Sequence, residues 1–164
     1  MGHIWLIGMM GSGKTTVGVF AAQILDRPFL DTDAIVMTNT GRTIPELFKD
    51  GEAEFRKAES IVIASAAAEV DSVIASGGGS VLSRDNVAIM EGSGTVVLLD
   101  VDAATIAERV QIGSDRPLLQ TAAAMEHILA ERAEVYNDVA QHIVSTVGRT
   151  PQDVAMEVAA CVDM

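Results

Sequence analysis

The sequence has little basic charge. Its 164 residues contain 11 Lys and Arg against 23 Asp and Glu, which gives a formal net charge of −12 at pH 7. Proteins that bind nucleic acid neutralise phosphates with a basic face, so this charge argues against a nucleic-acid partner and disfavours binding to anionic membranes. The acidity fits a solvated, self-repelling surface or a saline habitat, and composition does not separate the two.

Cysteine and long apolar stretches are equally scarce. The single cysteine, Cys161, has no partner for an intrachain disulfide and falls on the apolar spacing of Val154 and Val158, which favours a buried thiol. No run of 18 uninterrupted apolar residues occurs, and the first residues carry no basic stretch or cleavage site. We therefore expect a cytoplasmic protein without a membrane span. No zinc site is expected, because metal-ligand spacing is lacking among His3, His127 and His142.

What is present is an alternation of short β-rich runs with helical patterns. The runs expected to form strands are residues 3–7, 28–31, 72–75, 95–99 and 142–145. Apolar, nearly unbroken runs suit a sheet that is buried on both faces, and strands that alternate with helices favour a parallel sheet. The last helix should begin at Thr150-Pro151, a capping residue followed by proline. We expect one α/β domain over residues 1–164, with ligands at the carboxyl ends of its strands.

A phosphate-binding pattern follows the first expected strand. The stretch Gly8-Met9-Met10-Gly11-Ser12-Gly13-Lys14-Thr15 matches G-x-x-x-x-G-K-[ST] and opens an expected helix. Lys14 should reach the β- and γ-phosphates of ATP, and the Thr15 hydroxyl should ligate Mg²⁺. The alternative is a glycine-rich turn that carries Lys-Thr by chance. We expect the P-loop NTPase fold, in which helices flank five parallel strands in three layers. The expected ATP contacts are Gly11, Ser12, Gly13, Lys14, Thr15 and Thr16.

Further motifs follow in order along the chain. They are Asp31-Thr32-Asp33, Gly41-Arg42-Thr43-Ile44 through Phe48, Gly51-Glu52 with Phe55-Arg56 to Glu59, Gly77-Gly78-Gly79, and Arg116-Pro117-Leu118-Leu119. With the phosphate loop, they resemble the shikimate kinase family over nearly the whole chain. The resemblance implies that ATP and Mg²⁺ serve to phosphorylate shikimate at its 3-OH, giving shikimate 3-phosphate and ADP in aromatic amino-acid synthesis. It also implies a monomer, an acceptor-binding segment at about residues 33–60 and a lid at about 111–122.

Two aspartates follow the second expected strand. Side chains two residues apart lie on the same side of an extended segment, so Asp31 and Asp33 can both face the cleft. By resemblance, Asp31 would hold Mg²⁺, through water, while Asp33 would bind the acceptor hydroxyls and act as catalytic base. The alternative for either residue is an Asx turn in which the aspartate caps the following helix.

The carboxylate of shikimate calls for arginine, because a guanidinium binds a carboxylate through two parallel hydrogen bonds. Arg56 and Arg132 match the family's carboxylate-binding positions, and Glu59, one helical turn after Arg56, would orient that guanidinium. Taken alone, both arginines fit the solvated surface of a helix better, because most arginines are exposed, and only the surrounding motif favours a binding role. The triple glycine, residues 77–79, would let the main chain approach the acceptor carboxylate, with a flexible turn as the alternative.

The remaining assignments follow from the resemblance. The apolar walls of the acceptor pocket would be Phe48, Phe55, Pro117 and Leu118, although aromatic residues at such spacing more often belong to an ordinary core. Arg116 would arrive over the transferring phosphoryl group when the lid closes. Arg109 and Arg149 would lie on either side of the adenine.

The sequence departs from the family pattern in two places. Val19 stands where the family often has a basic residue, and the segment between Arg116 and Arg132 is short, which puts the closure of the lid in doubt. Two other functions stay open. One is a kinase for another polyol acid, such as gluconate, and the other is a nucleotide-binding protein that has lost catalysis.

Overall fold

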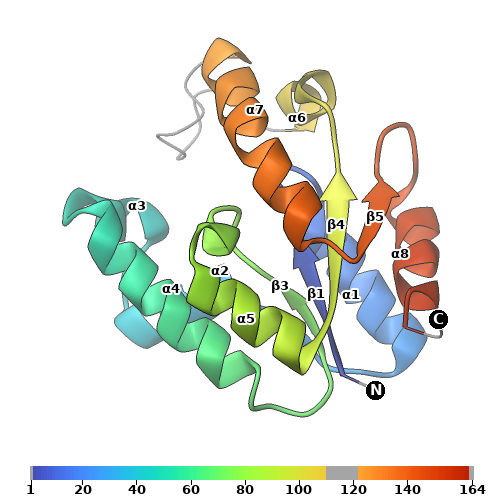
Figure 1. Cartoon of the computed structure of the whole chain (residues 1–164), viewed down its shortest axis with the longest axis horizontal. Coiled ribbons are helices and arrows are strands. Elements are labelled where there is room, and N and C mark those ends of the chain that lie inside the picture. Colours follow the sequence, from blue (N-terminus) through green and yellow to red (C-terminus); the bar gives the residue numbers. More distant parts are fainter. Residues whose placement is uncertain (1, 110–121, 163–164) are drawn as a thin grey trace.

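The structure, a computed structural model, describes residues 2–109 and 122–162. Its strands are β1 (His3–Ile7), β2 (Phe29–Asp31), β3 (Val73–Ala75), β4 (Gly94–Asp100) and β5 (His142–Ser145). Its helices are α1 (Lys14–Leu25), α2 (Thr32–Thr40), α3 (Ile44–Lys49), α4 (Glu52–Ala66), the 3₁₀ turn η1 (Ser80–Leu82), α5 (Arg84–Ser93), α6 (Ala103–Arg109), α7 (Ala122–Val139) and α8 (Pro151–Ala160). Figure 1 shows these elements along the chain.

The five strands form one parallel sheet in the order β2-β3-β1-β4-β5. This confirms the predicted α/β class and the predicted strands, whose ends differ from the observed ones by no more than one residue. The phosphate-loop strand β1 lies at the centre of the sheet, because the chain first builds β2 and β3 on one side and later β4 and β5 on the other. Ligands of such sheets bind where the strand order reverses, at the carboxyl ends of the strands.

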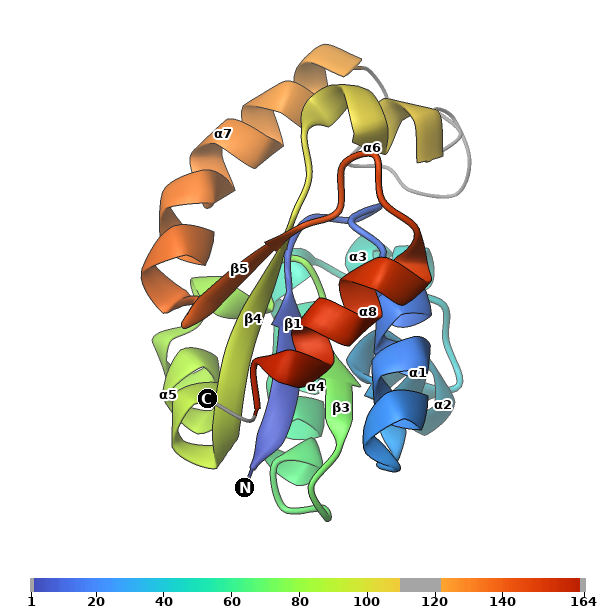
Figure 2. The same ribbon diagram turned by 90° about the vertical axis from the view of Figure 1, so that its right-hand side faces the viewer.

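Apolar side chains cover both faces of the sheet. Along β1, Trp5 and Ile7 point into the cluster that is covered by α4, α5 and α7, while Ile4 and Leu6 point into the cluster that is covered by α1 and α8. Side chains alternate between the faces of a strand, so a run that is apolar at every position needs a helical layer on each side. Figures 1 and 2 show these two layers with the sheet between them.

The C-terminal helix α8 confirms two predictions. Thr150 caps it by accepting a hydrogen bond from the N–H of Asp153, and Pro151 occupies its first turn. On its inner face, Cys161 is buried together with Val154 and Val158. The sulfur thus belongs to the core, and this burial raises the pKa of the Cys161 thiol.

Helices α2, α3 and α4 enclose a small core of their own. Val36, Leu47, Phe55 and Val62 form this cluster apart from the two sheet cores. A capping box begins α3: the Thr43 hydroxyl accepts from the N–H of Glu46, and the Glu46 carboxylate accepts from the N–H of Thr43. The segment that follows β2 is therefore a separately packed unit, attached to the sheet at the point where β2 ends.

Two further observations concern the helices. Among residues 2–109 and 122–162, no helix is long and apolar enough to cross a membrane. Val19, which replaces a basic residue of the family pattern, lies 37% exposed on α1. This departure from the pattern therefore affects the surface of the helix and not its packed face.

Candidate active site

Three strands end at the same edge of the sheet. The register pairs Leu6 with Ala75 and Asp31 with Ala75, so the carboxyl ends of β1, β3 and β2 are level. The phosphate loop follows β1, the aspartates follow β2 and the triple glycine follows β3. The predicted donor and acceptor groups therefore meet at one edge, and the topology alone brings them together.

The phosphate loop needs its glycines for two reasons. Gly11 and Gly13 have φ values of 81° and 93°, in the left-handed region that side chains disfavour. At Gly8, a Cβ would lie 2.8 Å from the carbonyl oxygen of Leu99, so the neighbouring strand leaves no space for one. These constraints show that the stretch is a tight loop that depends on its glycines.

The start of α1 is left open for an anion. Its N-cap, Gly13, offers no side-chain cap, and the first turn carries no acidic residue. The Ser12 hydroxyl is fully buried and has no hydrogen-bond partner among the described residues. Lys14 Nζ donates to the carbonyl oxygens of Gly8 and Met9, at 2.7 and 2.9 Å. Uncapped N–H groups, an unpartnered hydroxyl and an ammonium around one loop suit phosphate.

Asp31 performs two tasks at once. Its Oδ1 caps α2 by accepting from the N–H groups of Asp33 and Ala34, and its Oδ2 accepts from the Thr15 hydroxyl at 2.8 Å. The helix-capping alternative is therefore confirmed for Asp31, and its second oxygen lies beside Thr15, while its part in binding Mg²⁺ stays a prediction. The hydroxyl of Thr15 and a carboxylate oxygen are both hard oxygen donors, so the pair fits Mg²⁺, which takes one or two protein ligands and completes its shell with water and phosphate.

Arg56 and Glu59 form a partly buried ion pair on α4. Arg56 Nη1 lies 2.8 Å from Oε1 of Glu59, whose side chain is fully buried, while Glu52 pairs with Arg56 from the exposed side. Burial raises the pKa of Glu59, and the nearby Asp33 carboxylate raises it further, while Arg56 lowers it. The orientation of Arg56 by Glu59 that the spacing predicts is therefore present, and the Arg56 guanidinium also lies 5.2 Å from the centroid of the Phe55 ring.

The triple glycine makes room for charged side chains of the protein itself. A Cβ on Gly79 would lie 2.6 Å from Cζ of Arg56, and a Cβ on Gly77 would lie 2.5 Å from Oε2 of Glu59 and 2.9 Å from Oδ1 of Asp33. Neither glycine has a positive φ, so space and not backbone freedom requires them. The predicted approach of this main chain to a ligand stays a prediction.

Helix α7 contacts the same loop from the other side. Arg132 Nη1 lies 3.6 Å from the position that a Cβ on Gly78 would take. Tyr136, one helical turn further along, is 3% exposed and donates a hydrogen bond from its hydroxyl to the carbonyl oxygen of Gly78. The two predicted carboxylate-binding arginines thus reach residues 78–79 from different helices, α4 and α7.

The two predicted adenine-side arginines have different surroundings. Arg109 Nη1 donates to the carbonyl oxygens of Gly11 and Ser12 and to the Thr146 hydroxyl, so it joins the phosphate loop to the end of β5. Arg149 instead donates to the Ser145 carbonyl and pairs with Glu157 on α8, at 2.8 Å. Arg109 lies beside the loop, while the part of Arg149 in adenine binding stays a prediction.

One predicted pocket residue follows the alternative of an ordinary core residue, and three others lie outside the described residues. Phe55 is 4% exposed and stacks on Phe48 at a centroid distance of 4.7 Å, so Phe55 belongs to the small core and supports Arg56 from beneath. Arg116, Pro117 and Leu118 lie outside the described residues, as do residues 111–121 of the predicted lid.

Sequence reasoning missed two residues that the structure places at the site. Tyr136 gave two signals: it is the only tyrosine, and it follows Arg132 by one helical turn. Thr146, the partner of Arg109, gave no signal, because a threonine after a short strand is common and its contact spans 37 residues.

Comparisons with known proteins agree with this geometry. The sequence model of the shikimate kinase family matches residues 10–163. The shikimate kinase of Salinispora arenicola is 44% identical over 158 residues, which is 94% of each chain. The solved structure of the shikimate kinase from Acinetobacter baumannii in complex with shikimate has a TM-score of 0.94 at 32% identity and covers 99% of this chain and 93% of that one. A gluconokinase from Sinorhizobium meliloti has a TM-score of 0.60 at 18% identity, with 99% and 91% covered, and shows a shared fold alone.

Proposed function

We propose that the site described above carries out the reaction of the shikimate kinase family, to which this chain belongs. That reaction is the ATP-dependent phosphorylation of shikimate, and the chain is a kinase that acts on an alcohol. The observation that carries the proposal is the meeting of the phosphate loop, the Thr15–Asp31 pair and Arg56 at one edge of the sheet. We place the transfer on the 3-OH, as the resemblance implies.

The donor side holds ATP through its phosphates. The N–H groups of the loop and of the first turn of α1 surround them, and Lys14 exchanges its two carbonyl contacts for phosphate oxygens. Thr15 and Asp31 would hold Mg²⁺, which when bound offsets the charge on the β- and γ-phosphates. Arg109, which already contacts the loop, would lie along the nucleotide, with Arg149 on the far side of the base.

The acceptor side holds shikimate through its carboxylate. Arg56, oriented by Glu59, and Arg132 offer planar guanidinium groups from α4 and α7, and the main chain at residues 77–79 lies between them. These groups fix the ring so that a hydroxyl faces the γ-phosphate. Positioning of this kind supplies much of the rate in phosphoryl transfer, because the chemistry itself needs no covalent enzyme intermediate.

Asp33 is the proposed base. Its Oδ1 is buried against Gly77, at the edge where donor and acceptor meet. As the acceptor oxygen bonds to the γ-phosphorus, the bond to the bridging oxygen breaks, ADP leaves, and the hydroxyl proton passes to the Asp33 carboxylate. Arg116, which lies outside the described residues, would neutralise charge on the transferred group.

The test is ADP release from purified protein with ATP and Mg²⁺, measured without acceptor and with shikimate, gluconate or quinate. Of the three acceptors, we expect only shikimate to support turnover. Asp33→Asn should abolish this turnover, because it keeps the size of the side chain but removes the base. ATP binding without turnover on any acceptor would instead favour a nucleotide-binding protein without catalysis.

A second test separates the two halves of the site. Arg56→Ala should raise the KM for shikimate by about 10- to 100-fold, the value of a lost charge-assisted hydrogen bond, and leave the KM for ATP near that of the wild type. The matched control is Arg42→Ala, because Arg42 pairs with Asp50 at 2.6 Å and donates to the Glu46 carbonyl, on the exposed surface of the same segment. If both KM values rose together in Arg56→Ala, the proposed division would be wrong.

Gluconate is the weaker acceptor candidate, since the gluconokinase likeness concerns the fold alone. We further propose that residues 33–60 form the acceptor-binding segment, for which the separate core of α2, α3 and α4 is support, and that residues 111–122 form the lid. A cytoplasmic monomer fits the single buried thiol and the acidic composition.

A further inference from the structure

We propose that Tyr136 is a positioning residue for the acceptor, which sets Arg132 and the loop of residues 77–79 at the spacing that the shikimate carboxylate requires. This inference rests on the proposed function and deepens it, because it adds a residue that touches neither substrate. Tyr136 acts through two contacts, one to the main chain of the loop and one along its own helix.

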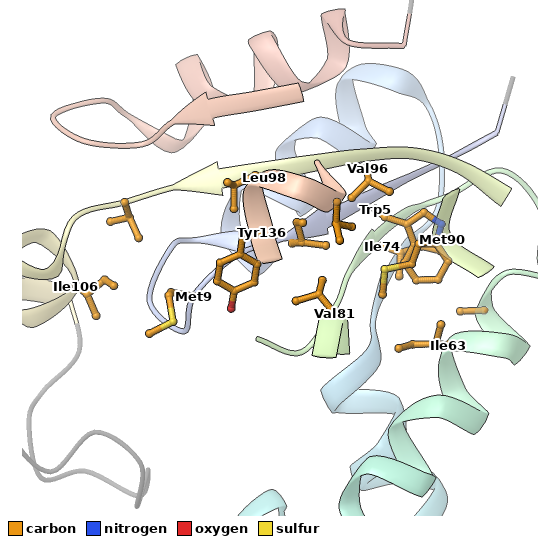
Figure 3. Packing of buried hydrophobic residues seen from close by; sticks show 14 of the residues in the cluster. Trp5, Met9, Ile63, Ile74, Val81, Met90, Val96, Leu98, Ile106 and Tyr136 are labelled. Carbon is orange, nitrogen blue, oxygen red and sulfur yellow. The ribbon is translucent and has the colours of Figure 1, made fainter. Parts of the chain in front are cut away.

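The first contact joins two elements that are distant in sequence. The Tyr136 hydroxyl on α7 donates to the carbonyl oxygen of Gly78, 58 residues earlier in the chain. The ring itself is 3% exposed and belongs to the cluster that also contains Met9 and Val81. Figure 3 shows the ring beneath β4, near Met9 and Val81, with its hydroxyl oxygen pointing away from the strand. The core thus holds the ring in place, and the hydrogen bond from the ring holds the main chain at Gly78.

The second contact runs along α7. Residues four apart lie one above the other on a helix, so Arg132 and Tyr136 share one face. Arg132 Nη1 reaches within 3.6 Å of the Cβ position at Gly78, while the Arg56 guanidinium lies against Gly79 from α4. Residues 77–79 therefore lie between the two arginines and set their separation. The hydrogen bond from Tyr136 to Gly78 joins α7 to these residues.

The donor role is secure over the working pH range. Burial raises the pKa of Tyr136, and the nearby Arg132 lowers it. Among the other charged groups nearby, Arg56 also lowers this pKa and Glu59 raises it. The phenol keeps its proton at neutral pH, so it donates to the Gly78 carbonyl throughout.

The alternative is a plain core tyrosine whose hydroxyl has simply found a partner. That role predicts a loss of stability in Tyr136→Phe and no change in substrate binding. Ser93→Ala is the matched control, because Ser93 accepts a hydrogen bond from another buried ring, Trp5 Nε1, at 3.0 Å, on α5. Each variant removes a hydrogen bond made by a buried aromatic ring, and Ser93→Ala also removes the bond from the Ser93 hydroxyl to the Ile89 carbonyl, so it is the harsher change. Only the Tyr136 bond reaches the acceptor loop.

The experiment measures shikimate and ATP binding by isothermal titration, and both KM values by ADP release. Tyr136→Phe should weaken shikimate binding and raise its KM by about three- to tenfold, the value of one hydrogen bond, with ATP values unchanged. Ser93→Ala should leave all four values unchanged. The titration also returns the binding stoichiometry, so a partly unfolded variant lowers the number of sites and not the affinity.

A double variant tests the path of the effect. In an Arg132→Gln background, Tyr136→Phe should weaken shikimate binding by a clearly smaller factor than in the wild type, because the arginine that Tyr136 positions is gone. Equal shikimate affinity in Tyr136→Phe and Ser93→Ala, or fully additive costs in the double variant, would overturn the inference while wild-type turnover upheld the proposed function. A wild-type protein that neither binds nor phosphorylates shikimate would overturn both, and the wild type alone would show this.

Discussion

Replacing Gly79 with alanine should weaken shikimate binding while leaving the fold intact. Gly79 has φ −100° and ψ 3°, which alanine adopts freely, so the backbone gains no strain. The new Cβ would lie 2.6 Å from Cζ and 2.7 Å from Nη1 of Arg56. An ordinary contact needs about 3.5 Å, so the guanidinium must move by about 1 Å. Arg56 is long and flexible, so the displacement changes the position of its guanidinium and leaves the packing of the fold intact.

The size of the effect follows from what the displaced guanidinium does. A hydrogen bond to a charged group contributes about 1.5–3 kcal/mol, and losing one to the acceptor carboxylate corresponds to a rise of about 10- to 100-fold in the KM for shikimate. The KM for ATP should stay unchanged, because the hydrogen bonds and ion pairs of Arg56 within the described part of the chain go to Glu52 and Glu59 and not to the phosphate loop.

Steady-state ADP release, with shikimate and ATP varied separately, measures both constants. Gly92→Ala is the matched control: a Cβ there meets nothing within 4 Å, on α5, away from the site. It should raise the free energy of unfolding by about 0.5–1 kcal/mol, since alanine favours helix, and leave the kinetics alone. An unchanged KM for shikimate in Gly79→Ala, or an equal rise in both constants, would refute the reasoning.

Three further predictions concern Glu59, Asp31 and Cys161. Burial raises the pKa of Glu59, so above the ordinary pKa of glutamate the native state binds more protons than the unfolded state does. The free energy of unfolding therefore falls as the pH rises towards the raised pKa. Glu59→Gln should flatten this pH dependence when unfolding by urea is measured at several pH values, and an unaltered slope would contradict the prediction. Asparagine caps helices as well as aspartate does, so Asp31→Asn should keep Tm while raising the Mg²⁺ concentration for half-maximal rate by about tenfold; a large loss of Tm would speak against this separation. Cys161 should react with a thiol reagent only after unfolding, and fast labelling of the native protein would show that it is not buried.

The sequence predicted the parts of the fold that depend on local patterns. Five apolar runs gave five strands, and the glycine pattern before Lys14 placed the loop and the start of α1 correctly. Asp31 shows why two local readings need not compete. A carboxylate has two oxygens, and here Oδ1 caps α2 while Oδ2 meets Thr15.

What the sequence did not predict depends on contacts between distant segments. The reason for Gly77 and Gly79 lies in the side chains of Glu59 and Arg56, which only the packing of α4 against the loop brings there. Tyr136 reads as an ordinary core residue until its partner at Gly78 is known. Burial of Phe55 likewise follows from its neighbours in three dimensions, whereas its spacing favoured an ordinary core without excluding a pocket wall.

The level ends of β1, β3 and β2 fix the spacing between the phosphate loop and the aspartates. Because β3 lies between the other two, the ends of β1 and β2 are separated by two strand spacings, about 10 Å. Backbone hydrogen bonds set that span, so no side-chain substitution at the edge alters it. Changes of substrate on this scaffold must therefore come from the loops that follow the strands, while the spacing between the phosphate loop and the aspartates after β2 stays the same.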